Sequence, residues 1–293
     1  MKISIVIPCY KSSKSLSYVV CEIVNILQIR PAVDYEIILV NDGSPDDTYS
    51  AISNLSSENI KVKGISLAMN FGQAAAMIAG YHFTTGDYVV HVDDDGQSPV
   101  NNLWKLVDKI EEGFDIVFSQ YPRKKNSLLQ KIGTGINNWM TSYLINKPKD
   151  LYFGNFWICR KFVIDEVIKC KNPYPYIAGF FLKTTLNIKG VLMEQRERKY
   201  GKTNYTFKKM FSLWLNGFTA FSIKPLRIAT GFGFICSLAG FFAMSYTVFL
   251  KIENPEIPAG YSSLIATILF IGGMLMFMLG MIGEYVGRIY LNI

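Results

Sequence analysis

The sequence lacks the patterns of secreted, zinc-binding and nucleic-acid-binding proteins. Its five cysteines include no CxxC pair and follow no regular spacing, so we interpret them as reduced core residues of a domain that faces the cytosol. Only two histidines occur, and we interpret His91, within an expected strand, as a packed core residue. No zinc motif or basic–aromatic platform for nucleic acid is present. The apolar run at residues 3–7 is too short for the core of a signal peptide.

Two long stretches near the end of the chain contain no charged residue. They cover residues 228–250 and 261–283, and each exceeds the ~20 residues that cross a bilayer as a helix. Lysines and arginines flank the pair on its outer sides, so the positive-inside rule places both ends of the chain in the cytoplasm. The basic residues behind the net charge of +7 crowd at 123–131 and 196–227, which favours membrane lipids or a phosphorylated substrate as partners over nucleic acid. We expect a hairpin of two transmembrane helices at 225–293.

The first part of the chain alternates strand and helix patterns. Continuous apolar runs of strand length cover residues 2–8, 35–40, 60–67, 88–92 and 114–119. Helical spacing of apolar residues covers residues 14–28, 45–55, 70–83 and 99–111, and we expect Asn70 to cap the third of these helices. This alternation predicts an α/β fold with a parallel sheet, which binds its ligands beyond the carboxyl ends of the strands.

The middle of the chain predicts a less regular set of elements. Residues 127–145 are amphipathic and fit either a helix that covers the core or one that lies in the membrane interface. Further strands and helices are expected at 152–159, 161–168 and 177–186, a last strand at 191–196, and a second interfacial helix at 207–221. The expected domains are a catalytic domain at 1–205, a juxtamembrane amphipathic helix at 206–224 and the hairpin at 225–293.

Three adjacent carboxylates follow the strand expected at 88–92. Asp93, Asp94 and Asp95 repel one another, and a fold keeps such a cluster at a strand end when a hard cation binds there. Their oxygens, with the amide of Gln97, suit Mg²⁺ or Mn²⁺. A solvated acidic turn is the alternative. The segments after the first two strands should converge with this one on a single crevice, because all three follow carboxyl ends of one sheet.

The three strand-end segments carry a family resemblance. The sequences IPCY (residues 7–10), NDGSPDDT (41–48) and DDDGQSP (93–99) resemble the signatures of family 2 glycosyltransferases with the GT-A fold. The resemblance extends through residues 70–72 (Asn-Phe-Gly), 86–87, 198–205 and 283–290 and covers essentially the whole chain. It is strongest to the polyprenyl-phosphate glycosyltransferases, among them dolichyl-phosphate mannose synthase and the undecaprenyl-phosphate enzymes of O-antigen glucosylation and the aminoarabinose pathway. It implies a Rossmann-like, mainly parallel GT-A domain with interfacial helices and a transmembrane hairpin.

The resemblance also implies roles for the strand-end residues. The nucleotide sugar would be bound by Pro8, Tyr10, Asp42, Asp93 and Asp94. Mg²⁺ or Mn²⁺ would be held by Asp93, Asp95 and Gln97. The cation would stabilise the nucleoside diphosphate as it leaves.

The acceptor implied by the resemblance is undecaprenyl phosphate. A phosphate monoester is mostly dianionic at pH 7, so this nucleophile needs positioning and charge compensation more than a general base. Arg198 and Lys202, with Arg123 as an outer candidate, can compensate the charge. Binding of lipid headgroups is the alternative for these cations. The catalytic candidates are Asp94, Asp95, Arg198 and Lys202.

Two positions depart from the family's pattern. The Asn-Glu pair that often follows the tyrosine of the first signature is Lys11-Ser12 here, which leaves the nucleotide base open. An aspartate that has been assigned as a base in some members is replaced by Asn155, which cannot take up a proton at neutral pH. Either no base is used, or Asp94 or Asp95 serves.

The hairpin and its flanking charges, together with the resemblance, imply a multi-pass enzyme of the bacterial inner membrane, with its GT-A domain and both termini in the cytoplasm. It would transfer one sugar, with inversion, from a UDP- or GDP-sugar to undecaprenyl phosphate, for lipopolysaccharide or another envelope glycan. A processive polysaccharide synthase is one alternative, but the chain has no Gln-x-x-Arg-Trp motif and only two expected spans. A non-catalytic membrane scaffold that binds sugar nucleotides is the other, and the acidic cluster argues against it. The sugar and any homo-oligomer stay open.

Overall fold

The apolar runs of the first half pair into one sheet. The computed structural model describes residues 1–121, 153–169, 177–194 and 260–292, with isolated positions between 231 and 253. Within this described part, seven strands lie in the order β3-β2-β1-β4-β6-β5-β7. They are β1 (Lys2–Cys9), β2 (Asp34–Asn41), β3 (Val62–Ser66), β4 (Tyr88–His91), β5 (Ile116–Gln120), β6 (Trp157–Arg160) and β7 (Ile188–Leu192).

The sheet is mainly parallel, as the alternation predicts. Among the strands that the structure describes, only β6 runs against its neighbours β4 and β5, and every other pair is parallel. The last strand was expected at residues 191–196, which is wrong by several residues: β7 ends at Leu192, where it pairs with Gln120 at the end of β5. The register of the partner strand, rather than the local apolar run, sets its position.

The helices follow the predicted spacing closely. They are α1 (Leu16–Leu27), α2 (Thr48–Glu58), α3 (Gln73–Tyr81), α4 (Leu103–Glu111), α6 (Lys161–Ile168) and α7 (Ile177–Thr184), with the 3₁₀ helix η1 (Val100–Asn102) before α4. The cap expected for α3 is wrong. Gly72 is the N-cap of this helix, because the Asn70 side chain instead donates a hydrogen bond to the carbonyl oxygen of Asp42, at 3.2 Å.

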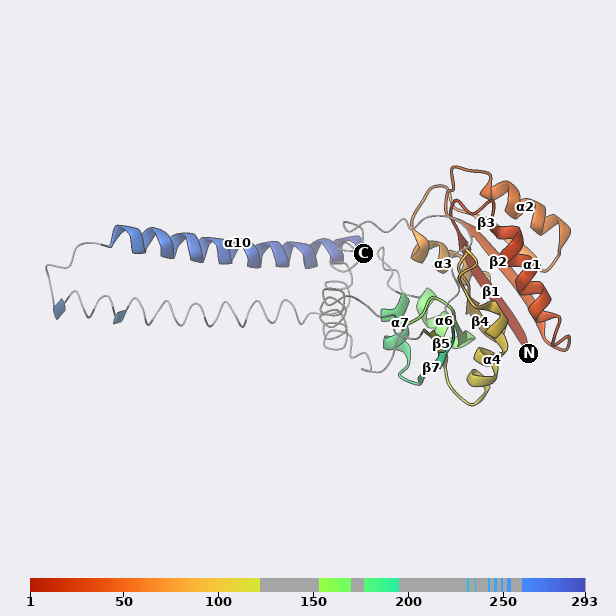
Figure 1. The fold of residues 1–293 in the computed structure, drawn as a ribbon. Helices are drawn as coiled ribbons and strands as arrows, with labels where there is room; N and C mark the ends of the chain where they lie inside the picture. The colour runs from red at the N-terminus through yellow and green to blue at the C-terminus, as the bar shows by residue number, and fades with distance from the viewer. Residues whose placement is uncertain are drawn as a thin grey trace. The chain divides into compact units, whose positions relative to one another are not determined.

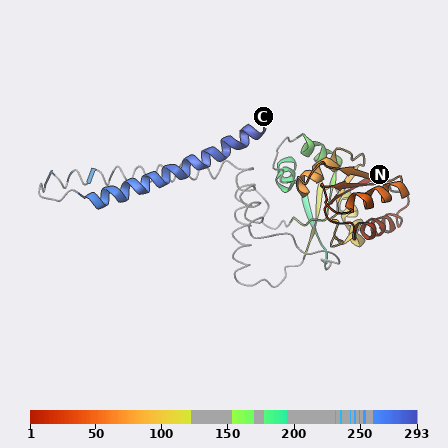
Figure 2. The same ribbon diagram turned by 90° about the horizontal axis from the view of Figure 1, so that it is seen from above.

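Helices cover both faces of the sheet (Figure 1; Figure 2). Strand alternation sends Ile3, Ile5 and Ile7 of β1 to one face, where they are fully buried in a cluster with residues of α1, α2 and α4. Val6 points to the other face, where α3 packs so closely that a Cβ at Gly80 would lie 2.5 Å from Val6 Cγ1. Fully burying one such aliphatic side chain contributes about 1.5–3 kcal/mol. The two helix layers therefore hold the strands whose ends form the site.

The chain divides into two compact units, Met1–Thr206 and Phe207–Ile293. The second unit contains α10 (Tyr261–Asn292), which includes the segment expected to form the second span. Among the residues that the structure describes, no helix combines the length and the hydropathy that crossing a bilayer requires. The helices expected at 127–145 and 207–221 lie outside the described residues, and residues 228–250 are described only at isolated positions.

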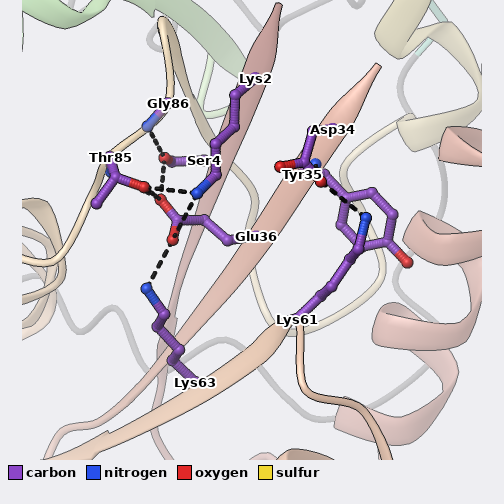
Figure 3. A network of polar contacts seen from close by, with 9 residues as sticks. All are labelled: Lys2, Ser4, Asp34, Tyr35, Glu36, Lys61, Lys63, Thr85 and Gly86. Carbon is purple, nitrogen blue, oxygen red and sulfur yellow. Dashed lines mark hydrogen bonds and ion pairs between the residues drawn. The ribbon is translucent and has the colours of Figure 1, made fainter. Parts of the chain in front are cut away.

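A buried carboxylate, Glu36, joins the strands near the end where β1 and β2 begin (Figure 3). Its Oε1 accepts hydrogen bonds from the Ser4 hydroxyl at 2.6 Å and from the Thr85 amide at 2.7 Å. Its Oε2 accepts one from Lys63 Nζ at 2.7 Å, and the Gly86 amide donates to Ser4 Oγ at 2.8 Å. Burial alone would raise the pKa of Glu36, but these donors outweigh it and hold the pKa at about 2. The network therefore joins β1, β2, β3 and the turn before β4.

The lowered pKa makes Glu36 a source of pH-dependent stability. A carboxyl group with a lower pKa in the folded chain stabilises the fold above its unfolded pKa, and this contribution disappears as the pH falls from about 4.5 towards 2. Glu36→Gln should lower the free energy of unfolding by roughly 3 kcal/mol at pH 7, since one pKa unit corresponds to about 1.4 kcal/mol. The difference from the unmodified chain should shrink as the pH approaches 2.

Chemical denaturation of the full chain at several pH values measures this difference. The matched control is Glu112→Gln, which makes the same change in an exposed ion pair with Lys109 and should cost below about 1 kcal/mol. A deficit of Glu36→Gln that stays constant down to the acid limit would contradict the assignment.

Candidate active site

The carboxyl ends of β1, β2 and β4 meet at one edge of the sheet. These strands pair in parallel, with β1 between the other two. The Asp42 amide, just after β2, donates a hydrogen bond to the Cys9 carbonyl at the end of β1, at 2.9 Å. The Tyr10 amide, just after β1, donates to Asp94 Oδ2 at 3.0 Å. The predicted convergence of the three segments is confirmed.

The first two aspartates after β4 face opposite layers of the fold. Side chains alternate along a strand, and the pattern continues past the end of β4. Asp93 lies on the α3 side of the sheet, where its Oδ1 accepts a hydrogen bond from Gln73 Nε2 of α3 at 3.0 Å. Asp94 lies on the α1 side, where its carboxylate accepts a hydrogen bond from the Tyr10 amide. The mutual repulsion expected from the sequence is therefore relieved in part by separate hydrogen bonds.

The third aspartate is held in a tight turn. Asp95 Oδ1 accepts the Gln97 amide at 2.9 Å, and Gly96 between them has a φ of 75°, which suits glycine. The turn returns the chain to Asp93, whose amide donates to Ser98 Oγ at 3.1 Å. The acidic run is thus a compact loop in which each carboxylate has its own partner.

The pKa of Asp94 is raised by its surroundings. Burial raises its pKa to about 6; the charges of Asp93 and Asp95 act in the same direction, and the hydrogen bond from the Tyr10 amide opposes them. A carboxyl group with this pKa is mostly ionised at pH 7. It can accept hydrogen bonds from a bound substrate, and its role as a base stays a prediction.

Asp42 connects the end of β2 to the start of α3. It is 3 % exposed, and its two carboxylate oxygens accept the amides of Phe71 at 2.8 Å and Gly72 at 2.9 Å. The next residue, Gly43, approaches the same segment so closely that a Cβ would lie 2.3 Å from the Met69 carbonyl carbon. A nucleotide contact by Asp42 would compete with these bonds.

A cavity of about 100 Å³ opens beside Asp93. Its lining consists of Asp93, Gln97, Ser98, Tyr121, Phe153, Gly154 and Asn155. Gly154 allows the wall to close on β5, because a Cβ at this position would lie 2.2 Å from the Ser119 carbonyl oxygen. The exposed amide of Asn155 therefore shares the cavity with the acidic loop.

Two of the three metal ligands expected from the sequence line the cavity. Asp93 and Gln97 line the cavity, and Asp95 Oδ1 accepts a hydrogen bond from the backbone amide of Gln97, whose side-chain amide is the expected ligand. Across the described part of the chain, no group of three or more histidine, cysteine, aspartate or glutamate side chains could hold a metal ion. Two carboxylates and an amide suit Mg²⁺ or Mn²⁺ when water or phosphate oxygens complete the coordination. The donor set therefore fits a cation that binds together with a diphosphate.

The residues of the first signature lie at the edge of the site. Pro8 is buried within β1 and does not line the cavity. Tyr10 is 37 % exposed, and Lys11 Nζ lies 5.4 Å from the centre of its ring. Lys11 has a φ of 58°, which is uncommon for a residue with a side chain. The nucleotide-binding roles of Pro8 and Tyr10 stay predictions.

His91 is a packed residue, as predicted. It is 2 % exposed and stacks on Trp157, with the ring centroids 5.5 Å apart.

The residues expected to bind the acceptor phosphate, Arg123, Arg198 and Lys202, lie outside the described residues.

Sequence reasoning missed three residues near Asp93. Tyr121 and Phe153 line the cavity, and Gln73 bonds to Asp93 from α3. The available signal for Gln73 was its position directly after an Asn-Phe-Gly segment that belongs to the family resemblance. Nothing local marked the other two.

Comparison with known families decides the assignment of the first unit. Residues 4–168 match the family described as "Glycosyl transferase family 2". The chain belongs to this family. It is therefore a glycosyltransferase, and its α/β domain is a GT-A domain. Residues 224–289 match the family described as "GtrB C-terminal hairpin".

Curated relatives extend over nearly the whole chain. The chain is 31 % identical over 292 residues to "Uncharacterized glycosyltransferase YkcC" of Bacillus subtilis (strain 168), covering 98 % of this chain and 89 % of the relative. It is 30 % identical over 305 residues to "Undecaprenyl-phosphate 4-deoxy-4-formamido-L-arabinose transferase" of Enterobacter sp. (strain 638), covering 100 % and 90 %. Similarity thus includes both the catalytic unit and the C-terminal segment.

Solved structures share the fold at lower identity. Glucosyl-3-phosphoglycerate synthase from Mycobacterium tuberculosis, crystallised with Mn²⁺, UDP and phosphoglyceric acid, superposes with a TM-score of 0.57 at 18 % identity. The alignment covers 74 % of this chain and 76 % of that one. The likeness supports the GT-A assignment.

The Asp42 contacts predict a loss of stability when the carboxylate is removed. Asp42→Ala should lower the free energy of unfolding by roughly 1.5–3 kcal/mol, because two amides lose a charged acceptor. The matched control is Asp47→Ala, an exposed aspartate whose side chain makes no capping hydrogen bond. Denaturation of both variants, with UDP titration by calorimetry, tests the assignment. Weakened UDP binding with unchanged stability would contradict it and favour direct contact with the nucleotide.

Proposed function

We propose that this enzyme transfers one sugar, with inversion, from a nucleotide sugar to undecaprenyl phosphate. The observation that carries the proposal is the cavity beside Asp93. Asp93 and Gln97, which follow β4, line it together with Asn155, which precedes β6. The full-length similarity to an undecaprenyl-phosphate transferase supports the choice of acceptor. The product would be a lipid-linked monosaccharide for an envelope glycan such as lipopolysaccharide.

The donor is a UDP- or GDP-sugar held at the carboxyl edge of the sheet. Pro8, Tyr10 and Asp42 would shape the nucleotide end, and Asp94 would accept hydrogen bonds from the ribose or sugar. Asp93, Asp95 and Gln97 would hold Mg²⁺ or Mn²⁺, which neutralises charge on the diphosphate. UDP and Mn²⁺ bound to a structural neighbour are consistent with this arrangement.

The acceptor phosphate attacks the sugar without strong assistance from a base. It is mostly dianionic at pH 7, and Asn155 in the cavity can donate or accept a hydrogen bond but cannot take up a proton. Arg198 and Lys202, with Arg123 further out, would compensate the charge of the lipid phosphate. If a base is used, Asp94 or Asp95 supplies it.

The lipid acceptor requires the catalytic unit to work at a membrane. The match of residues 224–289 to the GtrB C-terminal hairpin supports an anchor of two helices in a bacterial inner membrane. The basic residues around the hairpin would keep the GT-A domain and both termini in the cytoplasm, where nucleotide sugars are available.

The function is tested with membranes that contain the full chain. Incubation with a panel of radiolabelled nucleotide sugars and undecaprenyl phosphate should label a lipid-extractable product with one donor. Membranes without the protein are the control. Polymer formation would indicate a processive synthase, and the absence of transfer from every donor would overturn the proposal.

Removal of the carboxylate that lines the cavity should nearly abolish transfer. Asp93→Asn keeps the shape but removes the charge, and we expect a loss on the order of a hundredfold or more. Asp108→Asn, an exposed aspartate paired with Arg30, is the matched control and should retain activity. Activity of the unmodified enzyme that persists in excess EDTA would contradict the requirement for a metal.

Loss of the cations expected to bind the acceptor should impair transfer to the lipid and leave binding of the nucleotide nearly unchanged. Arg198→Ala and Lys202→Ala should each lower transfer efficiency roughly tenfold to a hundredfold, because a charge-assisted contact contributes about 1.5–3 kcal/mol. UDP affinity, measured by calorimetry, should change little. Lys199→Ala removes one charge from the same segment and serves as the control. An equal loss from this control would show that the segment only gathers lipid headgroups.

A further inference from the structure

The Asp93 carboxylate is restrained through one oxygen. Oδ1 accepts the Gln73 side-chain amide at 3.0 Å, and His91 Nε2 lies 3.4 Å from the same atom. Among the described residues, Oδ2 of Asp93 has no hydrogen-bond partner. The carboxylate is therefore fixed in orientation while one oxygen and the negative charge stay available to a ligand in the cavity.

Both restraining groups are themselves held in place. His91 is buried in β4 and stacks on Trp157 of β6. Gln73 is the first residue of α3, and the amides of the two residues before it are bonded to the Asp42 carboxylate. The end of β2 thus fixes the start of α3 and, through it, the position of the Gln73 side chain.

We propose that Gln73 is a positioning residue that orients Asp93 for a divalent cation, which rests on the metal-dependent function proposed above. The chemistry of the donor matters. A neutral amide restrains the carboxylate and leaves its charge intact, whereas an ammonium group at the same place would pair with the carboxylate and compete with the cation. The Gln73 side chain is exposed, so its hydrogen bond contributes little to the free energy of folding. A substitution at this position should therefore leave the chain folded.

Cation binding to the full-length protein tests the proposal directly. Mn²⁺ is titrated in the presence of UDP, and bound Mn²⁺ is followed by electron paramagnetic resonance. Gln73→Ala should weaken Mn²⁺ binding roughly tenfold, the usual scale for a group that orients a metal ligand. Gln73→Lys should weaken it further than Gln73→Ala, because it adds a competing cation beside Asp93. Thermal unfolding of both variants should match that of the unmodified chain.

Steady-state kinetics separate positioning from substrate contact. For Gln73→Ala, the Mn²⁺ concentration that gives half-maximal transfer should rise, while kcat at saturating Mn²⁺ should recover nearly fully. The matched control is Gln28→Ala, an exposed glutamine at the end of α1, which should leave Mn²⁺ affinity unchanged.

Several results would overturn the proposal. Unchanged Mn²⁺ affinity in Gln73→Ala is one, and affinity in Gln73→Lys equal to that of the unmodified chain is another. A kcat that stays low at saturating Mn²⁺ would place Gln73 in contact with the substrate. Failure of the proposed acceptor is distinguishable, because the binding titration needs no lipid: Mn²⁺ binding that depends on Gln73 without transfer to undecaprenyl phosphate would retain this inference and reject that function.

Discussion

Parallel pairing of β1 with β2 and β4 is the constraint on which the site depends. A slip of one residue between parallel strands would exchange the side chains that face the two helix layers. The fully buried residues of β1, such as Ile5 and Val6, therefore fix the levels at which the three strands end. Three segments that are distant in the sequence emerge side by side, and backbone groups such as the Tyr10 amide can bond directly to side chains of the acidic loop.

The same alternation that fixes the register determines what the acidic loop can do. Consecutive residues after β4 turn to opposite layers, so Asp93 meets α3 and Asp94 meets the segment before α1. A single cation therefore cannot draw on all three carboxylates equally. The division favours distinct tasks: Asp93 beside the cavity, Asp94 with its raised pKa against the Tyr10 amide, and Asp95 in the turn.

Local pattern was sufficient to predict the first five strands, the helices between them and the residues at the strand ends. It was not sufficient where a distant group decides the outcome. Asn70 has the chemistry of a helix cap, yet Asp42 attracts its side chain and moves the cap to Gly72. The antiparallel direction of β6 depends on its place between β4 and β5, which no local run encodes. The sequence around Gln73 predicts a residue of a helix, and its hydrogen bond to Asp93 depends on how α3 packs in the fold.

The carboxylates of Glu36 and Asp93 differ in how fully hydrogen-bond donors compensate their charge. Glu36 is buried, and donors reach both of its oxygens, so its charge is almost fully compensated and serves the stability of the sheet. Compensating Asp93 to the same degree would stabilise the loop further, but it would leave no free charge or oxygen for a cation. A neutral donor on one oxygen satisfies both demands, because it fixes the geometry without removing the charge. The incomplete partnering of Asp93 is thus what the proposed cation site requires, and the network around Glu36 can hold the strands in register independently of it.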